Sequence, residues 1–496
     1  MAFAKYLTAE KAFQEIRIYE QRDRVGGIWN LSKPEKTKRI PLPQINPRYG
    51  QNRSASTSKG TENGVNGFEK GNGNHDDGDA ESLEFESPLY DYLETNIPKP
   101  LMAYSDKPFA DDLPLFPDHK DVLRYIEEYA EDVQHLISFE TEVTRVTVEP
   151  NGPDGADEWT VETTDLKTRY HESAKFDAIV VANGHYTVPS VPEVRGLQQW
   201  SEAYPGSVIH SKAYRKPEDY TNKKVLVIGN SASGLDIAYQ IGQKCKQPIL
   251  LSSRSVSAFG TAPSADWRKD VDEVVEFVDP RQRSRAIRLA SGGIESDIDI
   301  VVFCTGYFYS YPFLKDIDPP VLDGGSRILG TYKHLFNIIR PTLACPLINL
   351  KVVPFPLAEN QAAVVARVWS GRLSLPSKDE MEAWERQIVQ KNGDGKYFHL
   401  MKFPQDAAQM NEMQEWSRQA SRHTGLENDG KGRVGMRWNE RQVWLRSKFP
   451  DIKAAYQKMG EQRSQVKSVQ ELGFDFDKWR ANASENDLVM FSEARC

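Results

Sequence analysis

Residues 223–238 read KKVLVIGNSASGLDIA, and they carry the clearest signal of the fold. Val225–Ile228 contains no polar residue and predicts a buried strand, after which a helical pattern begins. Between the two stands Gly229-x-Ser231-x-x-Gly234, which has the spacing of G-x-G-x-x-G with serine in the middle place. The glycines permit a tight turn and close packing of helix on strand, and the small serine lets the backbone approach a pyrophosphate. The stretch therefore predicts a dinucleotide-binding turn.

The next predicted strand, PILLSSR at 248–254, indicates which dinucleotide is bound. It ends in Arg254, about twenty residues beyond Gly234, where an NAD site usually carries an acidic residue for the ribose. An arginine suits a 2′-phosphate instead, so NADPH is favoured over NADH. The alternative is a glycine-rich turn beside a surface arginine.

Other buried strands that run into glycine occur in FDAIVVANGHY (176–186) and DIDIVVFCTGYFY (297–309). Such strands alternate with helical patterns, for example at 119–133, which predicts an α/β protein with parallel sheets. ISFETEVTRVTVEP (137–150) and EWTVETTD (158–165) predict antiparallel strands, and the chain after Pro376 is expected to be mostly helical.

The first thirty residues, MAFAKYLTAEKAFQEIRIYEQRDRVGGIWN, predict a helix over 1–13 and a short strand that ends at Glu20. A helix followed by a strand that ends in an acidic residue is the second half of a dinucleotide-binding unit. Gly26 and Gly27 follow, where the backbone can pass close to a cofactor. The preceding strand and its glycine-rich turn are expected to be absent, and the alternative is a helix and strand with no ligand.

Composition excludes several classes of function. The 496 residues suit two or more domains or one large composite domain, and the net charge of −8 without a basic block argues against a nucleic-acid partner. No apolar run is long enough for a membrane span. The four cysteines are scattered, which argues against a zinc site, a disulfide framework or a dithiol centre and favours a cytoplasmic setting. Residues 51–79 have the composition of a disordered surface insertion.

Several segments together resemble the flavin-containing monooxygenases. YEQRDRVGGIWN (19–30) is similar to the flavin-side segment of that family, and NIPKPLMAYSDKPF (96–109) to the segment that carries its active-site asparagine. YPGSVIHSKAYR (204–215) resembles its F-x-G-x-x-x-H-x-x-x-Y/F signature, with tyrosine in the leading place. GNSASG, FCTGYFYSYPF and PFPLAENQAAVVARVWSGRLSLPSKDEM (354–381) resemble its NADPH turn, second hinge strand and late helix. The signature ends in Tyr214 and not in tryptophan, which favours the heteroatom-oxidising, fungal-type branch over Baeyer–Villiger relatives.

The resemblance implies two Rossmann-like dinucleotide-binding domains, with an NADPH domain inserted in an FAD domain that lacks its first strand. The expected division is FAD domain at 1–200, NADPH domain at 201–303, and the rest of the FAD domain with C-terminal helices at 304–496. FAD and NADPH are the implied cofactors, and no metal site is expected. The resemblance leaves a homodimer open.

The implied activity is that of a flavin-dependent monooxygenase of the N,N-dimethylaniline type, which oxygenates soft nitrogen or sulfur nucleophiles with O₂ through a C4a-hydroperoxyflavin. Asn96 is implied as the catalytic residue, and a cap or turn asparagine is its alternative. The implied FAD ligands are Glu20, Gly26, Gly27, Trp29 and Gln361, the last with a surface helix glutamine as alternative. The implied NADPH ligands are Gly229, Ser231, Gly234 and Arg254. His210 is expected to hold the domain junction without transferring protons.

Two other functions stay open at this point. A chain without the first glycine-rich turn could be a noncatalytic protein that retains only an NADP site. A different flavin enzyme, such as an amino-acid or amine N-hydroxylase, would share the double dinucleotide-binding layout.

Overall fold

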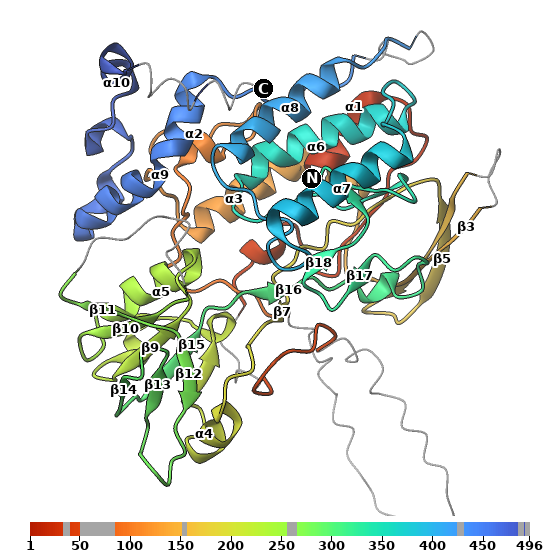
Figure 1. Ribbon diagram of the computed structural model, residues 1–496. Helices are drawn as coiled ribbons and strands as arrows, with labels where there is room; N and C mark the ends of the chain where they lie inside the picture. The colour runs from red at the N-terminus through yellow and green to blue at the C-terminus, as the bar shows by residue number, and fades with distance from the viewer. Residues whose placement is uncertain are drawn as a thin grey trace, which may run out of the picture.

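Two lobes make up the protein, and a pair of short strands joins them (Figure 1). The computed structural model describes residues 1–32, 40–49, 85–150, 156–254, 265–423, 431–484 and 491. The predicted insertion at 51–79 lies outside the described residues. The joining strands are β7 (Val188–Pro189) and β16 (Tyr307–Phe308), which pair antiparallel. The chain between them forms most of the lower lobe of Figure 1, and most of the other described residues form the upper lobe. Ile40, Leu42 and Tyr90, from outside this stretch, also pack against the core of the lower lobe.

The lower lobe is built on a five-stranded parallel sheet. Its order is β11 (Arg268–Val271), β10 (Ile249–Ser252), β9 (Val225–Ile228), β15 (Ile300–Phe303) and β8 (Val208–His210). Helices α4 (Leu197–Ala203) and α5 (Ala232–Gly242) and the antiparallel strands β12 (Val274–Phe277), β13 (Ile287–Leu289) and β14 (Ile294–Glu295) complete it. The predicted strand at 225–228 is confirmed: it is central, and Val225, Leu226 and Val227 are fully buried because neighbours cover both faces.

The core of the lower lobe includes residues that precede position 201. Val191, Leu197 and Trp200 pack with Leu226 and Phe303 of the central strands. The lobe therefore begins directly after the hinge strand β7, ahead of the boundary expected from the sequence. Trp200 on α4 is fully buried and adds a large aromatic side chain to this apolar cluster.

The upper lobe holds its parallel strands in two separate pieces. Strand β1 (Ile18–Tyr19) pairs parallel with β2 (Ile137–Ser138). Strand β6 (Ile179–Val180) pairs parallel with β21 (Leu343–Ala344), which continues antiparallel into β20 (Phe336–Asn337) and β19 (Thr331–Tyr332). Within the described ranges no strand pairs with the second edge of β1 or of β6. The backbone groups on those two edges are therefore left without a strand partner.

Further strands extend this lobe. The predicted antiparallel strands are confirmed as β3 (Thr141–Glu149) and β4 (Glu158–Asp165), with β5 (His171–Phe176) completing a three-stranded sheet. A short hairpin is formed by β17 (Leu322–Asp323) and β18 (Arg327–Ile328).

Helices cover the upper lobe, as expected for the chain after Pro376. They are α1 (Ala2–Glu10), α2 (Lys99–Met102), α3 (His119–Ala130), α6 (Pro354–Trp369), α7 (Lys378–Asn392), α8 (Gln405–Arg418), α9 (Glu440–Lys458) and α10 (Phe476–Asn482). Helix α1 ends before the predicted residue 13 because Lys11 adopts a left-handed conformation, with φ 59°. Helix α6 lies between α1 and α8 and is buried along most of its length.

Short 3₁₀ turns connect the larger elements. They are η1 (Gly27–Trp29), η3 (Glu131–Leu136), η5 (Ser211–Ala213), η6 (Pro217–Tyr220), η7 (Pro312–Leu314), η8 (Gly460–Gln465) and η9 (Gln470–Leu472).

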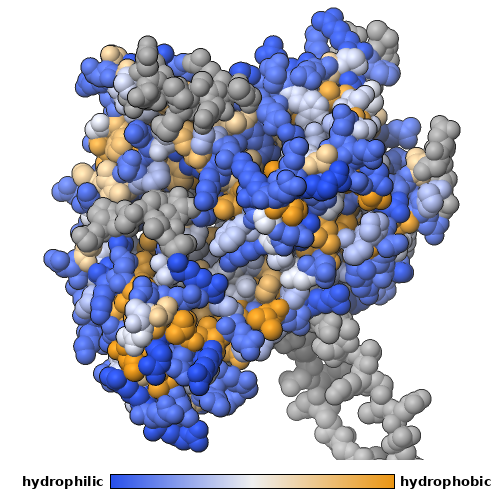
Figure 2. Space-filling model, viewed as in Figure 1, coloured by the Kyte–Doolittle hydropathy of each residue, from blue (hydrophilic) through white to orange (hydrophobic). Residues whose placement is uncertain are grey.

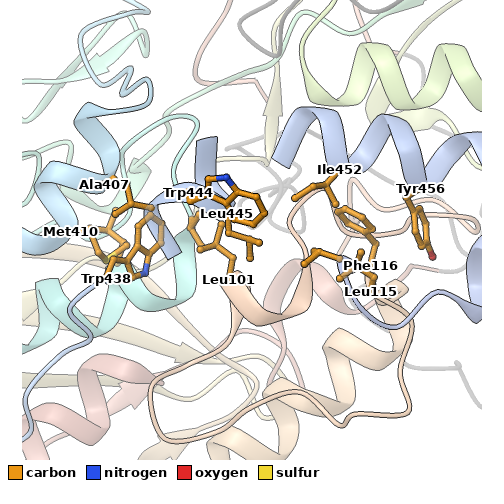
Figure 3. Close-up of a cluster of buried hydrophobic side chains, with 14 of the residues drawn as sticks. Leu101, Leu115, Phe116, Ala407, Met410, Trp438, Trp444, Leu445, Ile452 and Tyr456 are labelled. Atoms are coloured by element: carbon orange, nitrogen blue, oxygen red, sulfur yellow. The ribbon is translucent and has the colours of Figure 1, made fainter. Parts of the chain in front are cut away.

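The C-terminal helices are held by an apolar cluster that includes Leu101 of α2 and Trp444 and Ile452 of α9 (Figure 3). On the face shown in Figure 2 the surface is mostly hydrophilic, and hydrophobic residues gather over the lower lobe and in the band between the lobes. No helix in the described part of the chain combines the length and apolar character that crossing a bilayer requires.

Candidate cofactor cleft

A large cleft of about 3990 Å³ lies between the lobes. Its walls include the turn after β9, the end of β10 and the segment after β1, which are the carboxyl ends of parallel strands. This is where open α/β sheets bind their ligands. Eight of the ten predicted site residues line it, namely Glu20, Gly26, Gly27, Trp29, Asn96, Gly229, Ser231 and Arg254.

The turn after β9 has the geometry that its glycines predict. Gly229 has φ 110°, and a Cβ built there would lie 2.5 Å from the carbonyl oxygen of Cys304. A Cβ on Gly234 would lie 1.9 Å from the Gly229 carbonyl oxygen, so this glycine sets the contact between α5 and its strand and does not itself line the cleft. Ser231 is the N-cap of α5 and is exposed to the cleft. The helix thus presents its N-terminal amide groups where a phosphate can bind.

Arg254 lies at the edge of the cleft beyond β10. Its Nε forms an ion pair with Glu273 at 2.7 Å, and its side chain is 71% exposed. An exposed pair of this kind holds the guanidinium only weakly. The side chain is therefore free to exchange its carboxylate partner for a stronger anion such as a phosphate.

On the opposite side of the cleft, the backbone turns sharply at Gly26 and Gly27. Gly26 has φ 106°, and a Cβ there would lie 2.3 Å from Leu123 Cδ1. Gly27 has φ 51°, and a Cβ there would meet no atom within 4 Å, so its open side faces the cleft. The Asn30 side-chain amide donates to the carbonyl oxygens of Val25 and Gly27 at 2.9 and 3.2 Å and fixes the turn. A flat ring system can approach Gly27 closely.

Glu20 lies beside this turn at the end of β1. Its Oε1 accepts a hydrogen bond from the Arg22 amide at 2.9 Å, and partial burial raises the pKa of the carboxyl group. A second carboxylate oxygen is left to accept from a ligand hydroxyl. Trp29 lines the same wall and packs partly against the cluster around α3.

Asn96 lies on the cleft wall, in the segment before α2. The N-cap of α2 is Pro98, and no side chain caps that helix, so Asn96 does not have the alternative role of a cap. In the part of the chain that the structure describes, no hydrogen bond holds the Asn96 amide. Its polar atoms are available to a ligand.

Gln361 lies behind the cleft wall and not on it. It is fully buried in α6, where its Oε1 accepts from the Leu347 amide at 3.0 Å and its Nε2 lies 3.4 Å from Asn349 Oδ1. The alternative of a surface glutamine is wrong because α6 packs between α1 and α8. Gln361 therefore positions the segment of Leu347 and Asn349, which does line the cleft.

His210 holds the lobe junction. Its Nδ1 accepts from the Lys212 amide at 3.1 Å, so Nε2 carries the proton and donates to the Gly306 carbonyl at 3.0 Å. Burial lowers the pKa of His210 to about 3, which keeps the imidazole neutral. These contacts fit the expected structural role of His210.

Lys396 is a cleft residue that no sequence motif marks. It lies between α7 and α8, far along the chain from the nucleotide turns, and its Nζ donates to the Thr305 carbonyl at 2.9 Å. Within the described residues no group of three or more histidine, cysteine, aspartate or glutamate side chains could hold a metal ion.

The geometry of both turns fits a dinucleotide on each side of the cleft: an open glycine backbone with an acidic side chain on one side, and a helix N-terminus with an arginine on the other. A comparison with known families agrees with this arrangement. The sequence model of the flavin-binding monooxygenase-like family matches residues 64–266 and 273–416, which make up more than half of the chain.

The chain belongs to this family.

Individual relatives extend the match. The flavin-containing monooxygenase iboF of Amanita muscaria is 27% identical over 446 residues, 81% of this monooxygenase and 83% of that protein. The thiol-specific monooxygenase of Saccharomyces cerevisiae is 30% identical over 335 residues, 62% of this chain and 72% of that protein. The prediction of a flavin-dependent monooxygenase is thereby confirmed.

Among solved structures, S-allyl-L-cysteine S-oxygenase from Allium sativum superposes with a TM-score of 0.69 at 26% identity, over 97% of this monooxygenase and 95% of that chain. The predicted α/β class with two dinucleotide-binding domains is confirmed.

Proposed function

We propose that this monooxygenase uses FAD and NADPH to transfer one oxygen atom from O₂ to a soft sulfur or nitrogen nucleophile, with a thiol or sulfide as the preferred substrate. In the balanced reaction, the substrate, O₂, NADPH and a proton give the oxygenated substrate, NADP⁺ and water. The bound flavin would supply the redox chemistry, and the protein supplies binding, orientation and electrostatics.

The observation that carries the proposal is that two nucleotide-type turns, about two hundred residues apart, open on one cleft. Gly229, Ser231 and Arg254 would hold the NADPH phosphates on the lower lobe. Glu20 would accept from the FAD ribose, and Gly27 would let the flavin side approach the backbone. The two cofactors would thus share one enclosed space, which direct hydride transfer between them requires.

Asn96 is proposed as the catalytic residue of this cleft. Its side-chain amide has a donor and an acceptor and no protein partner in the described residues, so it can bind at the reacting groups without breaking an internal contact. We expect it to orient the bound cofactors or substrate.

A sulfur substrate is favoured by the relatives. The S-allyl-L-cysteine S-oxygenase aligns over nearly the whole chain, and the yeast relative is named as thiol-specific. We also propose a cytoplasmic setting, which the three buried free cysteines in the described residues support.

The test begins with purified full chain. We expect a yellow protein that consumes NADPH and yields an S-oxygenated product from thiols or sulfides. Parallel assays with a tertiary amine and with ornithine test the nitrogen alternatives. A colourless protein that still binds NADPH would favour the noncatalytic NADP-binding alternative, and oxygenation of ornithine alone would favour an N-hydroxylase.

Asn96→Ala sharpens this test. It is expected to lower the rate of oxygenation by at least about tenfold, which is the scale of one lost hydrogen bond to a charged group. Thermal stability should be unchanged. Asn30→Ala is the matched control, since Asn30 has two backbone partners and its loss should lower stability. Equal activity of Asn96→Ala and the unaltered protein would remove Asn96 from the mechanism.

A further inference from the structure

Lys396 reaches across the cleft from the upper lobe to the edge of the nucleotide turn. Its Nζ donates to the Thr305 carbonyl at 2.9 Å and lies 3.9 Å from the position of a Cβ on Gly306. Thr305 directly follows Cys304, whose carbonyl oxygen closes against Gly229. A cation from the α7–α8 connection therefore lies beside the turn that opens α5.

Arg254 approaches the same region from the lower lobe. Thr305, the partner of Lys396, follows β15, and Arg254 follows β10; only β9 lies between these strands, so both cations lie at one edge of the sheet. Burial lowers the pKa of Lys396, and repulsion from the Arg254 guanidinium lowers it further. Both line the cleft along with Asn230, Ser231 and Ser253. Two like charges held in one cleft repel each other, and an anion bound between them offsets this repulsion.

The carboxylates near these cations do not neutralise them both. Glu273 pairs with Arg254. In the described residues no carboxylate forms an ion pair with Lys396, whose ammonium group donates to the neutral Thr305 carbonyl. The pair therefore has an excess positive charge that faces the cleft.

We propose that Lys396 and Arg254 together form the binding site for the 2′-phosphate of NADPH, so that the dinucleotide bridges the two lobes. The inference rests on the proposed NADPH site and adds a residue from the other lobe. Arginine can bind a phosphate through two parallel N–H groups, and lysine adds a compact charge that strengthens this contact. Preference for NADPH over NADH would then depend on the lobes being held together, and not on the lower lobe alone.

The competing role of Lys396 is purely mechanical. Its hydrogen bond to Thr305 could tether the α7–α8 connection to the hinge without contacting a ligand. Lys396→Gln separates the two roles, because glutamine can still donate to a carbonyl but carries no charge. Lys396→Arg keeps the charge, and Glu273→Gln removes the carboxylate that competes for Arg254.

The experiment measures calorimetric binding of adenosine 2′,5′-bisphosphate and of adenosine 5′-monophosphate to the full chain. These probes differ only in the 2′-phosphate and need neither turnover nor flavin. We expect the bisphosphate to bind more tightly. Lys396→Gln should weaken binding of the bisphosphate by about tenfold, on the scale of one charge-assisted hydrogen bond. Binding of the monophosphate should be unchanged. Lys396→Arg should retain most of the preference for the bisphosphate over the monophosphate, and Glu273→Gln should increase that preference.

Three results would overturn the inference. Lys396→Gln could weaken binding of both probes equally, or it could leave binding of the bisphosphate unchanged. The unaltered chain could also bind the two probes with equal affinity. Failure of the proposed function would look different. A chain that prefers the bisphosphate in a Lys396-dependent way but oxygenates no substrate would keep the phosphate site and reject the monooxygenation proposal.

Discussion

Each lobe holds a glycine turn at the end of a parallel strand, but the two strands differ in how they are paired and buried. In the lower lobe, β9 is paired on both sides, and Val225, Leu226 and Val227 are inaccessible to solvent. In the upper lobe, β1 and β6 each have one strand partner in the described residues, and their side chains are only half-buried. A glycine turn is held rigidly when its strand is central in a sheet. The comparison shows that the upper turn must be held by other contacts.

Those contacts come from helices and side chains. Glu10, at the end of α1, is fully buried in an ion pair with Arg372 at 2.5 Å, and Lys5 pairs with Asp132 at 2.8 Å. Asn30 holds the turn at Gly27 from within. Helix packing therefore positions the upper wall of the cleft, whereas strand pairing within the sheet positions the lower wall.

The largest expected difference between the lobes is in the cost of removing a strand side chain. Leu226→Ala should lower the free energy of unfolding of the lower lobe by about 3 kcal/mol, because the cavity is fully enclosed. Ile179→Ala on β6 should cost about half as much, since its side chain already borders the cleft. Urea unfolding of the two variants, followed by circular dichroism, measures both values. Equal costs would mean that the edge of β6 is covered as well as the centre of β9.

The two glycines of the upper turn provide a second, smaller contrast. Gly26→Ala should lower stability by about 2 kcal/mol, because a left-handed conformation and a close contact with Leu123 both oppose a side chain. Gly27→Ala should cost about 1 kcal/mol, since the space around it is open. Its methyl group would enter the cleft, so we expect it to reduce flavin content more than Gly26→Ala does at equal folded fraction. Thermal melts and the flavin absorbance measure the two effects, and unchanged flavin content in Gly27→Ala would place the flavin elsewhere.

A third contrast concerns acid stability at the junction of the lobes, where the expected effect appears only below neutral pH. The pKa of His210 is about 3 in the folded chain, below its ordinary value, so the unfolded chain binds the extra proton first as pH falls. The stability associated with neutral His210 is present above about pH 6.5 and is lost as pH falls from there toward 3, with a slope approaching about 1.4 kcal/mol per pH unit. His210→Gln should make the loss shallower by about that slope. Urea midpoints between pH 7 and pH 5, compared for the two proteins, test this, and parallel curves would contradict it.

Much of the lower wall could be predicted because its signals are local. The apolar run before Gly229, the spacing to Gly234 and the basic end of β10 all lie within one segment of chain, and each has a direct backbone consequence. The roles of Gln361 and Lys396 could not be predicted in this way. Gln361 is buried by α1 and α8, and Lys396 reaches the hinge only because the α7–α8 connection folds back over the cleft.

Sequence patterns alone predicted the α/β class, the glycine-rich turn after β9, the second glycine turn at Gly27 and the family, because close backbone approach and strand burial leave a pattern in neighbouring residues. The tertiary structure alone decided which polar groups face the shared cleft. It placed Asn96 on the wall without a protein partner and Gln361 behind it, and it brought a lysine from the upper lobe beside the lower lobe's turn. Such placements depend on packing between segments hundreds of residues apart, and no local pattern records them.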